Sequence, residues 1–543
     1  MMKVLRVVLL GLFSGSVVGE DFSAVNDTPA DISFTALLLS QERKGTAVLA
    51  QELVNEGSLS LSATDIVAIR AELCGGLTNS MKFYLYAVED DGSETLLREQ
   101  TENFQPFTVF GKTPPDVYKG SADFERFRTY VLRAETYLLR EAEGEVQAST
   151  AITFKVESFE SKVTASDAAD GYDFGEVVAT SGDDVVVGSP ADDRFSSRNG
   201  SAYVYSRAGR GWSQVATLTA GVTSSAFGSA AATSRVALVV GAPFDVDAGV
   251  ASGSAYVVLK ESRLRPGELW SQAAKLTASD AAFNDRFGSA VAVDGDTLVV
   301  GAPTDDDPSN SGAAYVFKSD NAGLTWSEVA KLKASDAAEA DLFGASVAIS
   351  GGTIVIGAYS VDGVGTSSGS AYVFQSDDDG ETWSDKSLKL TAGDAATFDN
   401  FGAAVAVDGD TIVVGAHGDD DPSNSGAAYV FQRDGKTWPQ VAKLKASDAA
   451  EFDLFGGAVA VAGDTVVVGS PADDDAGSAS GSTYVFRRLG LGWSQVAKFT
   501  ATDANAGDNF GSSVAIDGDT LVAGAPRVVN DQFARGSAYV LSV

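Results

Sequence analysis

Short stretches in which apolar and small residues alternate recur along the last two-thirds of this chain, separated by clusters of Gly, Asp and Ser. Residues 287–336 serve as a template, with four such stretches at 287–293, 297–303, 313–319 and 326–335. They are rich in Val, Tyr, Phe and Trp, which between turn-forming residues predicts strands and not helices. Asp294-Gly295, between the first two stretches, favours a tight hairpin. The template is therefore expected to be an antiparallel sheet of four strands.

This unit recurs along the chain at a nearly constant period. In the last two-thirds of the chain the dipeptide Phe-Gly occurs seven times at spacings of 53 to 60 residues, each time followed by Gly-Ala-Pro or a close variant and then by Ala-Tyr-Val or a close variant. The seven pairs begin at Phe174, Phe227, Phe287, Phe343, Phe401, Phe455 and Phe510. A period of this size indicates a solenoid, a propeller or an array. Seven antiparallel units of four strands predict an all-β fold, a seven-bladed β-propeller with four-stranded blades.

The two ends of the repeat region indicate that the ring is closed. The final copy stops at its third strand, 536–543, whereas residues 162–167 match the fourth-strand segment 275–280 although no complete repeat precedes them. The segment from about Thr153 to Ala165 is therefore expected to complete the seventh blade from the N-terminal side. Such closure would leave no open sheet edge.

With these motifs in order, residues 152–543 resemble the FG-GAP repeat family, whose best-known member is the propeller of integrin α subunits. Gly-Ala-Pro stands at 241–243, 301–303 and 524–526, and Gly-Ser-Pro at 188–190 and 469–471. The resemblance implies a secreted or cell-surface propeller that binds proteins or glycans. Integrin-type blades often carry a calcium loop between the first two strands. Here that connection is as short as Asp-Gly-Asp, too short to surround a calcium ion, so those calcium sites are not carried over.

The residues before the repeats divide into two further segments. Lys3 and Arg6 precede an apolar run at 7–13 and a small-residue site near Gly19, which predicts a signal peptide over residues 1–19; a membrane anchor is the alternative. An immunoglobulin-like β-sandwich is expected over residues 20–150, followed by the propeller over 151–543. The strands expected before the propeller are 58–63, 65–73, 81–89, 94–100, 106–111, 128–139 and 146–156. The cysteine pair and core Trp of true immunoglobulin domains are missing.

Composition agrees with an extracellular protein that binds no nucleic acid. There are 39 Lys and Arg against 74 Asp and Glu, giving a formal charge of −35, which disfavours contacts with phosphates. No segment after the predicted signal peptide is long and apolar enough to span a bilayer, so the protein is expected to be secreted or at the cell surface. Cys74 is the only cysteine and is expected to be buried. Asn26 and Asn199 fit the glycosylation pattern, and their use stays open.

Acidic residues gather in two sets of loops expected at the same end of the propeller. In the first set, between second and third strands, lie Asp192, Asp193, Asp245, Asp247, Asp305, Asp306, Asp307, Asp419, Asp420, Asp421, Asp473, Asp474 and Asp475. In the second, just before Phe-Gly, a D-x4-D spacing recurs as Asp280/Asp285, Asp336/Asp341, Asp394/Asp399, Asp448/Asp453 and Asp503/Asp508. These carboxylates form a candidate Ca²⁺ site or attract a basic partner. Alternatively they cap turns and keep the surface soluble.

Two further features bear on an enzymatic alternative. Residues 376–383 fit the Asp-box pattern S-x-D-x-G-x-T-W, and 319–326 fit it with Asn321 in place of Asp. Asp boxes resemble those of sialidase propellers, where they are structural. A sialidase-like glycosidase would need an arginine cluster, and Arg194, Arg198, Arg527 and Arg535 are expected to be neighbours. His417 is interpreted as a strand-end residue, and no catalytic residue or bound cofactor other than Ca²⁺ is predicted.

The sequence thus predicts a non-catalytic extracellular binding or adhesion protein whose acidic propeller face engages a protein or glycan, with Ca²⁺ as a candidate cofactor. A glycoside hydrolase and a structural wall or matrix component are the alternatives. The ligand itself and the oligomeric state stay open, because a fold does not fix a function.

Overall fold

A computed structural model describes residues 160–542 with short gaps and, before residue 160, the backbone of nine strands. After residue 159, the side chains that the structure does not describe are those of residues 168–172, 191–198, 209–210, 222–224, 236, 261–269, 307–309, 385, 420–423, 491 and 528–534. The chain divides into two compact units, with the boundary between Phe159 and Glu160. Each unit is described by itself.

The strands of the first unit form two sheets. Their bounds are β1 (Val4–Leu9), β2 (Asp31–Gln41), β3 (Ala47–Val54), β4 (Leu59–Leu61), β5 (Ile66–Cys74), β6 (Ser80–Val88), β7 (Glu94–Asn103), β8 (Thr129–Tyr137) and β9 (Val146–Val156). One sheet has the order β1-β5-β2-β3 and the other β4-β9-β8-β6-β7. The expected strand 106–111 lies outside the described residues, as does the side chain of Cys74. The immunoglobulin-like sandwich and the signal peptide, whose segment contains β1, stay predictions.

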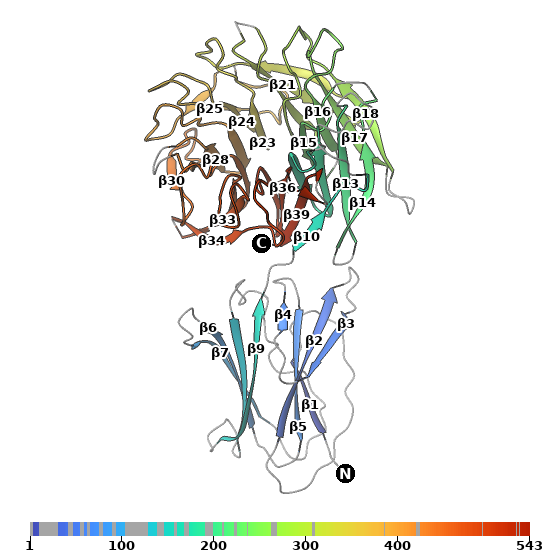
Figure 1. Cartoon of the computed structure of the whole chain (residues 1–543), viewed down its shortest axis with the longest axis vertical. Coiled ribbons are helices and arrows are strands. Elements are labelled where there is room, and N and C mark those ends of the chain that lie inside the picture. Colours follow the sequence, from blue (N-terminus) through green and yellow to red (C-terminus); the bar gives the residue numbers. More distant parts are fainter. Residues whose placement is uncertain are drawn as a thin grey trace. The chain divides into compact units, whose positions relative to one another are not determined.

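The second unit is the predicted seven-bladed propeller, and Figure 1 shows the blades following one another around the ring. Blade 1 consists of β11 (Val177–Ser181), β12 (Asp184–Ser189), β13 (Ser201–Ala208) and β14 (Gly211–Leu218). Blade 2 consists of β15 (Ala230–Thr233), β16 (Ala237–Ala242), β17 (Ser254–Glu261) and β18 (Leu269–Leu276). Blade 3 consists of β19 (Ala290–Asp294), β20 (Thr297–Ala302), β21 (Ala313–Lys318) and β22 (Ser327–Leu332). Blades 4 and 5 are β23 (Ser346–Ser350), β24 (Thr353–Ala358), β25 (Ser370–Gln375) and β26 (Leu388–Leu390), then β27 (Ala404–Asp408), β28 (Thr411–Ala416), β29 (Ala427–Gln432) and β30 (Gln440–Leu444). Blade 6 is β31 (Ala458–Ala462), β32 (Thr465–Ser470), β33 (Ser482–Leu489) and β34 (Gly492–Phe499).

Blade 7 is assembled from both ends of the repeat region. Its sheet has the order β10-β39-β36-β35, with β35 (Ser513–Asp517), β36 (Thr520–Ala525), β39 (Ser537–Ser542) and the outer strand β10 (Glu160–Val163); a small hairpin, β37 (Val529–Asn530) and β38 (Phe533–Ala534), precedes β39. Strand β10 pairs antiparallel with β39, Lys162 opposite Tyr539. In Figure 1 the cyan β10 accordingly lies beside the red β39. The borrowed strand is thus present, but it is shorter than the predicted Thr153–Ala165, because Thr153 belongs to β9 and pairs with β8.

The Phe-Gly dipeptides form the joints between blades. The N–H of Phe343, at the entrance to blade 4, donates to the carbonyl oxygen of Ser311 in blade 3 at 2.9 Å. Gly344 has a left-handed φ of +93°, and a Cβ there would lie 2.4 Å from the carbonyl oxygen of Ala313. A Cβ on Gly301 of Gly-Ala-Pro would in turn lie 2.0 Å from the carbonyl oxygen of Gly344. Glycine is required at both positions because two backbones meet without room for a side chain.

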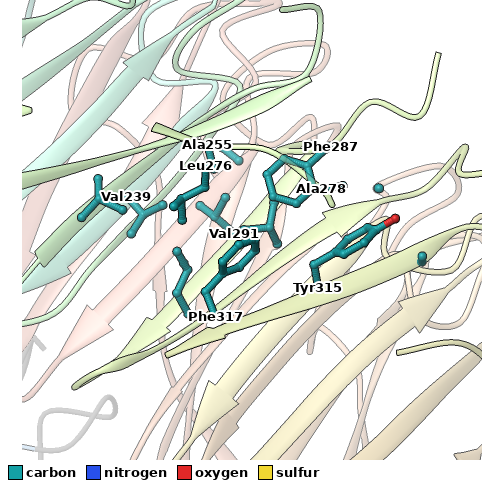
Figure 2. Close-up of a cluster of buried hydrophobic side chains, with 14 of the residues drawn as sticks. Val239, Ala255, Leu276, Ala278, Phe287, Val291, Tyr315 and Phe317 are labelled. Carbon is teal, nitrogen blue, oxygen red and sulfur yellow. The ribbon is translucent and has the colours of Figure 1, made fainter. Parts of the chain in front are cut away.

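The hydrophobic core lies between successive blades. Every Phe of the seven Phe-Gly pairs is almost fully buried, and its ring meets the Tyr of the same blade edge-on with centroids 5.3 to 5.5 Å apart. Figure 2 shows one such cluster, in which Val239 and Leu276 of blade 2 pack against Phe287 and Phe317 of blade 3. Because each core is shared by two blades, no blade buries its apolar face alone.

At the end of the propeller that carries the turns between first and second strands, neighbouring turns are joined by hydrogen bonds. The Asp294 carboxylate accepts from the N–H of Gly351 in the next blade at 2.7 Å, and Asp408 accepts from Gly463 at 2.7 Å. Asp517 of blade 7 accepts from Gly182 of blade 1 at 2.6 Å, across the closure. The first Asp of the Asp-Gly-Asp turns is therefore a link between blades.

Candidate functional site

The two predicted sets of acidic loops lie together at the other end of the propeller. The N–H of Asn284, just before Phe-Gly of blade 3, donates to the carbonyl oxygen of Val250 in the loop of blade 2 at 3.0 Å. The N–H of Asn509 donates in the same way to Ala479 at 3.1 Å. We call this surface the acidic loop face; it consists of the loops between second and third strands and the connections that enter each Phe-Gly pair. These main-chain bonds fix neighbouring loops against each other.

In blade 3 the carboxylates of the face belong to a network with a tyrosine and a lysine. The Tyr315 hydroxyl lies 2.7 Å from Asp280 and 2.5 Å from Asp305. The ammonium group of Lys331, on the outer strand, lies 2.7 Å from Asp280 and 2.9 Å from Asp305. Burial opposes the ionisation of Asp280, but the hydrogen bonds from Lys331 and Tyr315 outweigh it and hold the pKa of this carboxyl below its usual range.

The same network recurs with variations around the ring. Its tyrosine and lysine are Tyr256 and Lys275 in blade 2, Tyr372 and Lys389 in blade 4, Tyr429 and Lys443 in blade 5, Tyr484 and Lys498 in blade 6, and Tyr539 and Lys162 in blade 7. The carboxylates that they contact include Asp245, Asp336, Asp394, Asp419, Asp448, Asp473 and Asp503. Blade 4 has buried Val361 where blade 3 has Asp305. Blade 1 keeps the bond from Tyr203 to Asp167 at 2.8 Å and has Thr217 in the lysine position.

The second Asp of each D-x4-D pair has a different role. Asp285, Asp341, Asp399, Asp453 and Asp508 are buried, and each accepts a hydrogen bond from the N–H three residues earlier at 2.6 to 2.8 Å. Burial raises the pKa of Asp285, Asp341 and Asp453. These carboxylates hold the turn that leads into Phe-Gly, as the turn-capping interpretation predicts.

One group of described carboxylates has the spacing of a cation site. Oxygens of Asp448, Asp473 and Asp475 lie within 4.8 Å of one another. The ammonium group of Lys498 contacts all three residues, at 2.8 Å from Asp448 and 2.9 Å from Asp473, with a further contact to Asp475. As they stand, these donors do not fit a calcium ion, because a lysine already occupies the space between them. The lysines of the network reduce the repulsion among these carboxylates.

The remaining predicted residues fall into two groups. Asp306 and Asp474 are exposed on the acidic loop face. Asp192, Asp193, Asp307, Asp420, Asp421, Arg194 and Arg198 lie outside the described residues. The predicted cluster of four arginines therefore stays a prediction. Of its members the structure describes two, Arg527, which is exposed, and Arg535, which is partly buried. His417 follows β28, and burial lowers its pKa.

The Asp boxes stabilise the turns between third and fourth strands. Ser376 Oγ accepts from the N–H of Gly380 at 2.9 Å, and Asp378 accepts from the N–H of Thr382 at 2.9 Å. Hydrogen bonds from the Thr382 hydroxyl, the Thr382 N–H and the Ser376 hydroxyl, in that order, lower the pKa of Asp378 to about 2. Trp383 Nε1 donates to the carbonyl oxygen of Gly380 at 3.2 Å. This bonding is structural, as the sequence predicts.

The lysines of the face are functional-site residues that the sequence reasoning missed. They stand five residues before the first Asp of the next connection, as in Lys275 and Asp280 or Lys331 and Asp336. The signal was this constant K-x4-D spacing. It did not identify the partner, because Lys331 contacts Asp280, which lies one whole repeat earlier.

The comparison with protein families decides what kind of propeller this is. The model of the FG-GAP repeat matches residues 158–205, 212–258, 270–317, 326–374, 383–431, 438–486 and 493–541. The chain belongs to the FG-GAP repeat family. Each FG-GAP match begins in or a few residues before the outer strand of one blade and ends in the third strand of the next, so the sequence repeat is offset by one strand from the blade.

Other comparisons add little about this FG-GAP protein. No curated protein matches the chain. Among solved structures, a chain from "Crystal Structure of Mitotic Checkpoint Complex" is 13% identical with a TM-score of 0.41, over 70% of this chain and 93% of that one. A structure titled as an ancestral GH74 enzyme is 10% identical with a TM-score of 0.40, over 84% of this chain and 60% of that one. In the described part of the FG-GAP chain, no helix is long and apolar enough to cross a membrane.

Proposed function

We propose that this FG-GAP protein is a non-catalytic extracellular binding protein whose acidic loop face engages a protein or glycan ligand. The observation that carries the proposal is the rigid loop array. Loops of neighbouring blades are joined by main-chain hydrogen bonds, such as that from Asn284 to Val250, and their carboxylates are held by tyrosine and lysine. Preorganised loops lose little conformational entropy on binding, which favours affinity.

The extracellular location is part of the same proposal. It is supported by the predicted signal peptide over residues 1–19 and by the formal charge of −35. Expression of the full chain with residues 1–19 in a secreting host tests it. We expect the protein in the medium with a new N-terminus near residue 20, and retention in the cytosol with Met1 intact would contradict the proposal.

Binding is tested with arrays of glycans and of extracellular proteins probed with the full chain. A ligand of the acidic loop face should bind less well to the variant Asp306→Asn/Asp474→Asn, because both carboxylates are exposed on that face. The matched control, Asp377→Asn/Glu381→Gln, removes two exposed charges from an Asp-box turn at the other end. Equal loss in both variants would contradict a role for this face.

The effect of calcium on the propeller is tested separately. Calcium binding to the inner carboxylates requires displacement of a lysine such as Lys498, so we expect thermal unfolding to differ little between millimolar calcium and a chelator. A large stabilisation by calcium would contradict this expectation and assign the ion to other carboxylates of the face.

The glycosidase alternative rests on the predicted arginine corner. It requires turnover of acidic or neutral glycosides by the full chain, and loss of turnover in Arg527→Ala and Arg535→Ala variants. We expect no turnover on such a panel. Turnover that both arginine variants abolish would replace the binding proposal by the enzymatic one.

A further inference from the structure

We propose that the ligand of the acidic loop face is a cationic, amphipathic polypeptide segment, and that exposed phenylalanines of this face are its apolar anchors. This inference rests on the proposed function and names the class of ligand. It starts from Phe283, Phe398 and Phe452, which stand in the connections that enter blades 3, 5 and 6.

The exposure of these side chains is unusual for this molecule. Phe283 is 71% exposed, Phe398 60% and Phe452 58%, whereas the seven phenylalanines of the Phe-Gly pairs are at most 1% exposed. The remaining strongly exposed phenylalanine among the described residues, Phe244 at 43%, also belongs to this face. Large apolar side chains left in water on one face mark an interaction site more often than a fold requirement.

The backbone at two of these positions indicates that the fold does not need phenylalanine there. Phe398 and Phe452 have φ of +67° and +68°, and the equivalent residues in other connections are Asn284, Ala340 and Gly507 at +65°, +64° and +85°. This left-handed region favours Gly and Asn and is unfavourable for a bulky residue. Because both rings are exposed, packing does not offset the strain. A residue kept in a strained and exposed position points to a role in binding.

Apolar side chains from adjacent loops lie beside these phenylalanines. Val250, 65% exposed, follows Gly249, where an added Cβ would lie 3.5 Å from Cα of Phe283. The N–H of Phe398 donates to the carbonyl oxygen of Thr366 at 2.8 Å, two residues after Val364, which is 76% exposed. Phe283 and Phe398 therefore each belong to a small apolar surface made by two loops of neighbouring blades.

The charge around the anchors selects the partner. Glu451, next to Phe452, is exposed, and so are Asp306 and Asp474 on the same face. The whole chain carries a formal charge of −35. A segment that combines Lys or Arg with apolar side chains complements both the carboxylates and the phenyl rings. A neutral glycan would match the polar groups of this face but not its charge.

The test uses the full chain and a fluorescent synthetic peptide made of lysine and leucine, with binding followed by fluorescence anisotropy. We expect saturable binding that weakens as salt is raised. The variant Phe398→Asn/Phe452→Asn should bind the peptide about tenfold more weakly or worse, since anchor residues are worth more than ~1.4 kcal/mol. Asn suits the left-handed backbone, so the melting temperature of this variant should not fall.

The matched control is Leu324→Asn/Leu489→Asn, which removes two side chains of similar exposure, 59% and 61%, from turns at the other end of the propeller. It should bind the peptide like the original chain. Equal binding by both double variants, undiminished binding of a peptide with Glu in place of Lys, or no peptide binding at all would overturn the inference. Binding of neutral oligosaccharides alone to this face would also overturn it while keeping the proposed function. Absence of any ligand on the arrays would contradict both.

Discussion

At the scale of single residues, the tyrosine of each Ala-Tyr-Val motif connects the core of a blade to its acidic end. Tyr315 packs its ring edge-on against Phe287, and its hydroxyl lies between Asp280 and Asp305. Burial, followed by the hydrogen bonds with these two carboxylates, raises the pKa of Tyr315. The hydroxyl therefore stays protonated, and its one O–H can donate to either carboxylate.

This arrangement predicts a graded response to loss of the hydroxyl. Tyr315→Phe removes the hydroxyl that donates to the buried Asp305, while the ion pair with Lys331 stays, and should lower the free energy of unfolding by about 2 kcal/mol. Tyr372→Phe in blade 4 should cost only about 1 kcal/mol, because Val361 replaces the second carboxylate there and Asp336 is exposed. Denaturant unfolding of both variants measures the difference. Equal costs would show that the second carboxylate adds nothing.

The joint glycines allow an equally local prediction. Gly344→Ala places a Cβ 2.4 Å from the carbonyl oxygen of Ala313 and should lower the free energy of unfolding by more than about 3 kcal/mol, or prevent folding. Gly351→Ala, also at positive φ but with nothing within 4 Å of the added Cβ, should cost about 1 kcal/mol. Thermal unfolding of the pair separates the effect of the clash from that of backbone strain, and similar melting temperatures would contradict the role of the joint.

At the scale of elements, the strands of each blade could be predicted because the residues that indicate each strand lie within or beside it. Alternating small and apolar residues, Asp-Gly turns and the Phe-Gly period all act within one repeat. Strands β20 to β22 lie within the stretches expected for the template, and β19 exceeds its stretch only at Asp294. Contacts between repeats had no such signal. The bond from Gly351 to Asp294 and the ion pair from Lys331 to Asp280 both join residues about one repeat apart, so the sequence pattern did not reveal these partners.

The hydrogen bonds between turns of neighbouring blades can be tested by adding one where it is missing. Blade 6 has Ala462 where blades 3, 5 and 7 have Asp294, Asp408 and Asp517. Ala462→Asp should add a bond to the N–H of Gly518 in blade 7 and raise the free energy of unfolding by about 0.5 to 1 kcal/mol. Ala462→Val, which adds size without an acceptor, should not. A melting temperature for the Asp variant at or below that of the original chain would contradict a stabilising role for these bonds between turns.

At the scale of the whole molecule, the repeated networks predict how stability depends on pH. Burial raises the pKa of Asp245, Asp280, Asp336, Asp394, Asp473 and Asp503, but hydrogen bonds from tyrosine and lysine outweigh it, so the pKa of each is lowered on folding. Their stabilisation is present above the unfolded pKa of about 4 and is lost as pH falls through the lower folded pKa. The raised pKa of Asp285, Asp341 and Asp453 acts in the opposite direction but in fewer groups.

We therefore expect the melting temperature of the propeller to fall steeply below pH ~4. The hydrogen bonds of Lys331 and Lys443 with aspartates outweigh burial and raise the pKa of each lysine, so their contribution is complete below the usual lysine value of 10.5 and is lost as pH rises through the folded pKa. Differential scanning calorimetry at acidic and at alkaline pH measures both losses of stability. A melting temperature that rises on acidification below pH ~4 would contradict the networks.

The offset between the sequence repeat and the blade has a consequence for how such proteins change over generations. Each repeat gives its outer strand to the blade before it and receives one from the repeat that follows, with β10 and β39 meeting at the single seam. A genetic duplication or deletion of one whole repeat therefore leaves every sheet with four strands and the seam with the same two partners. Blade number can then change in one step, without any new interface having to arise first.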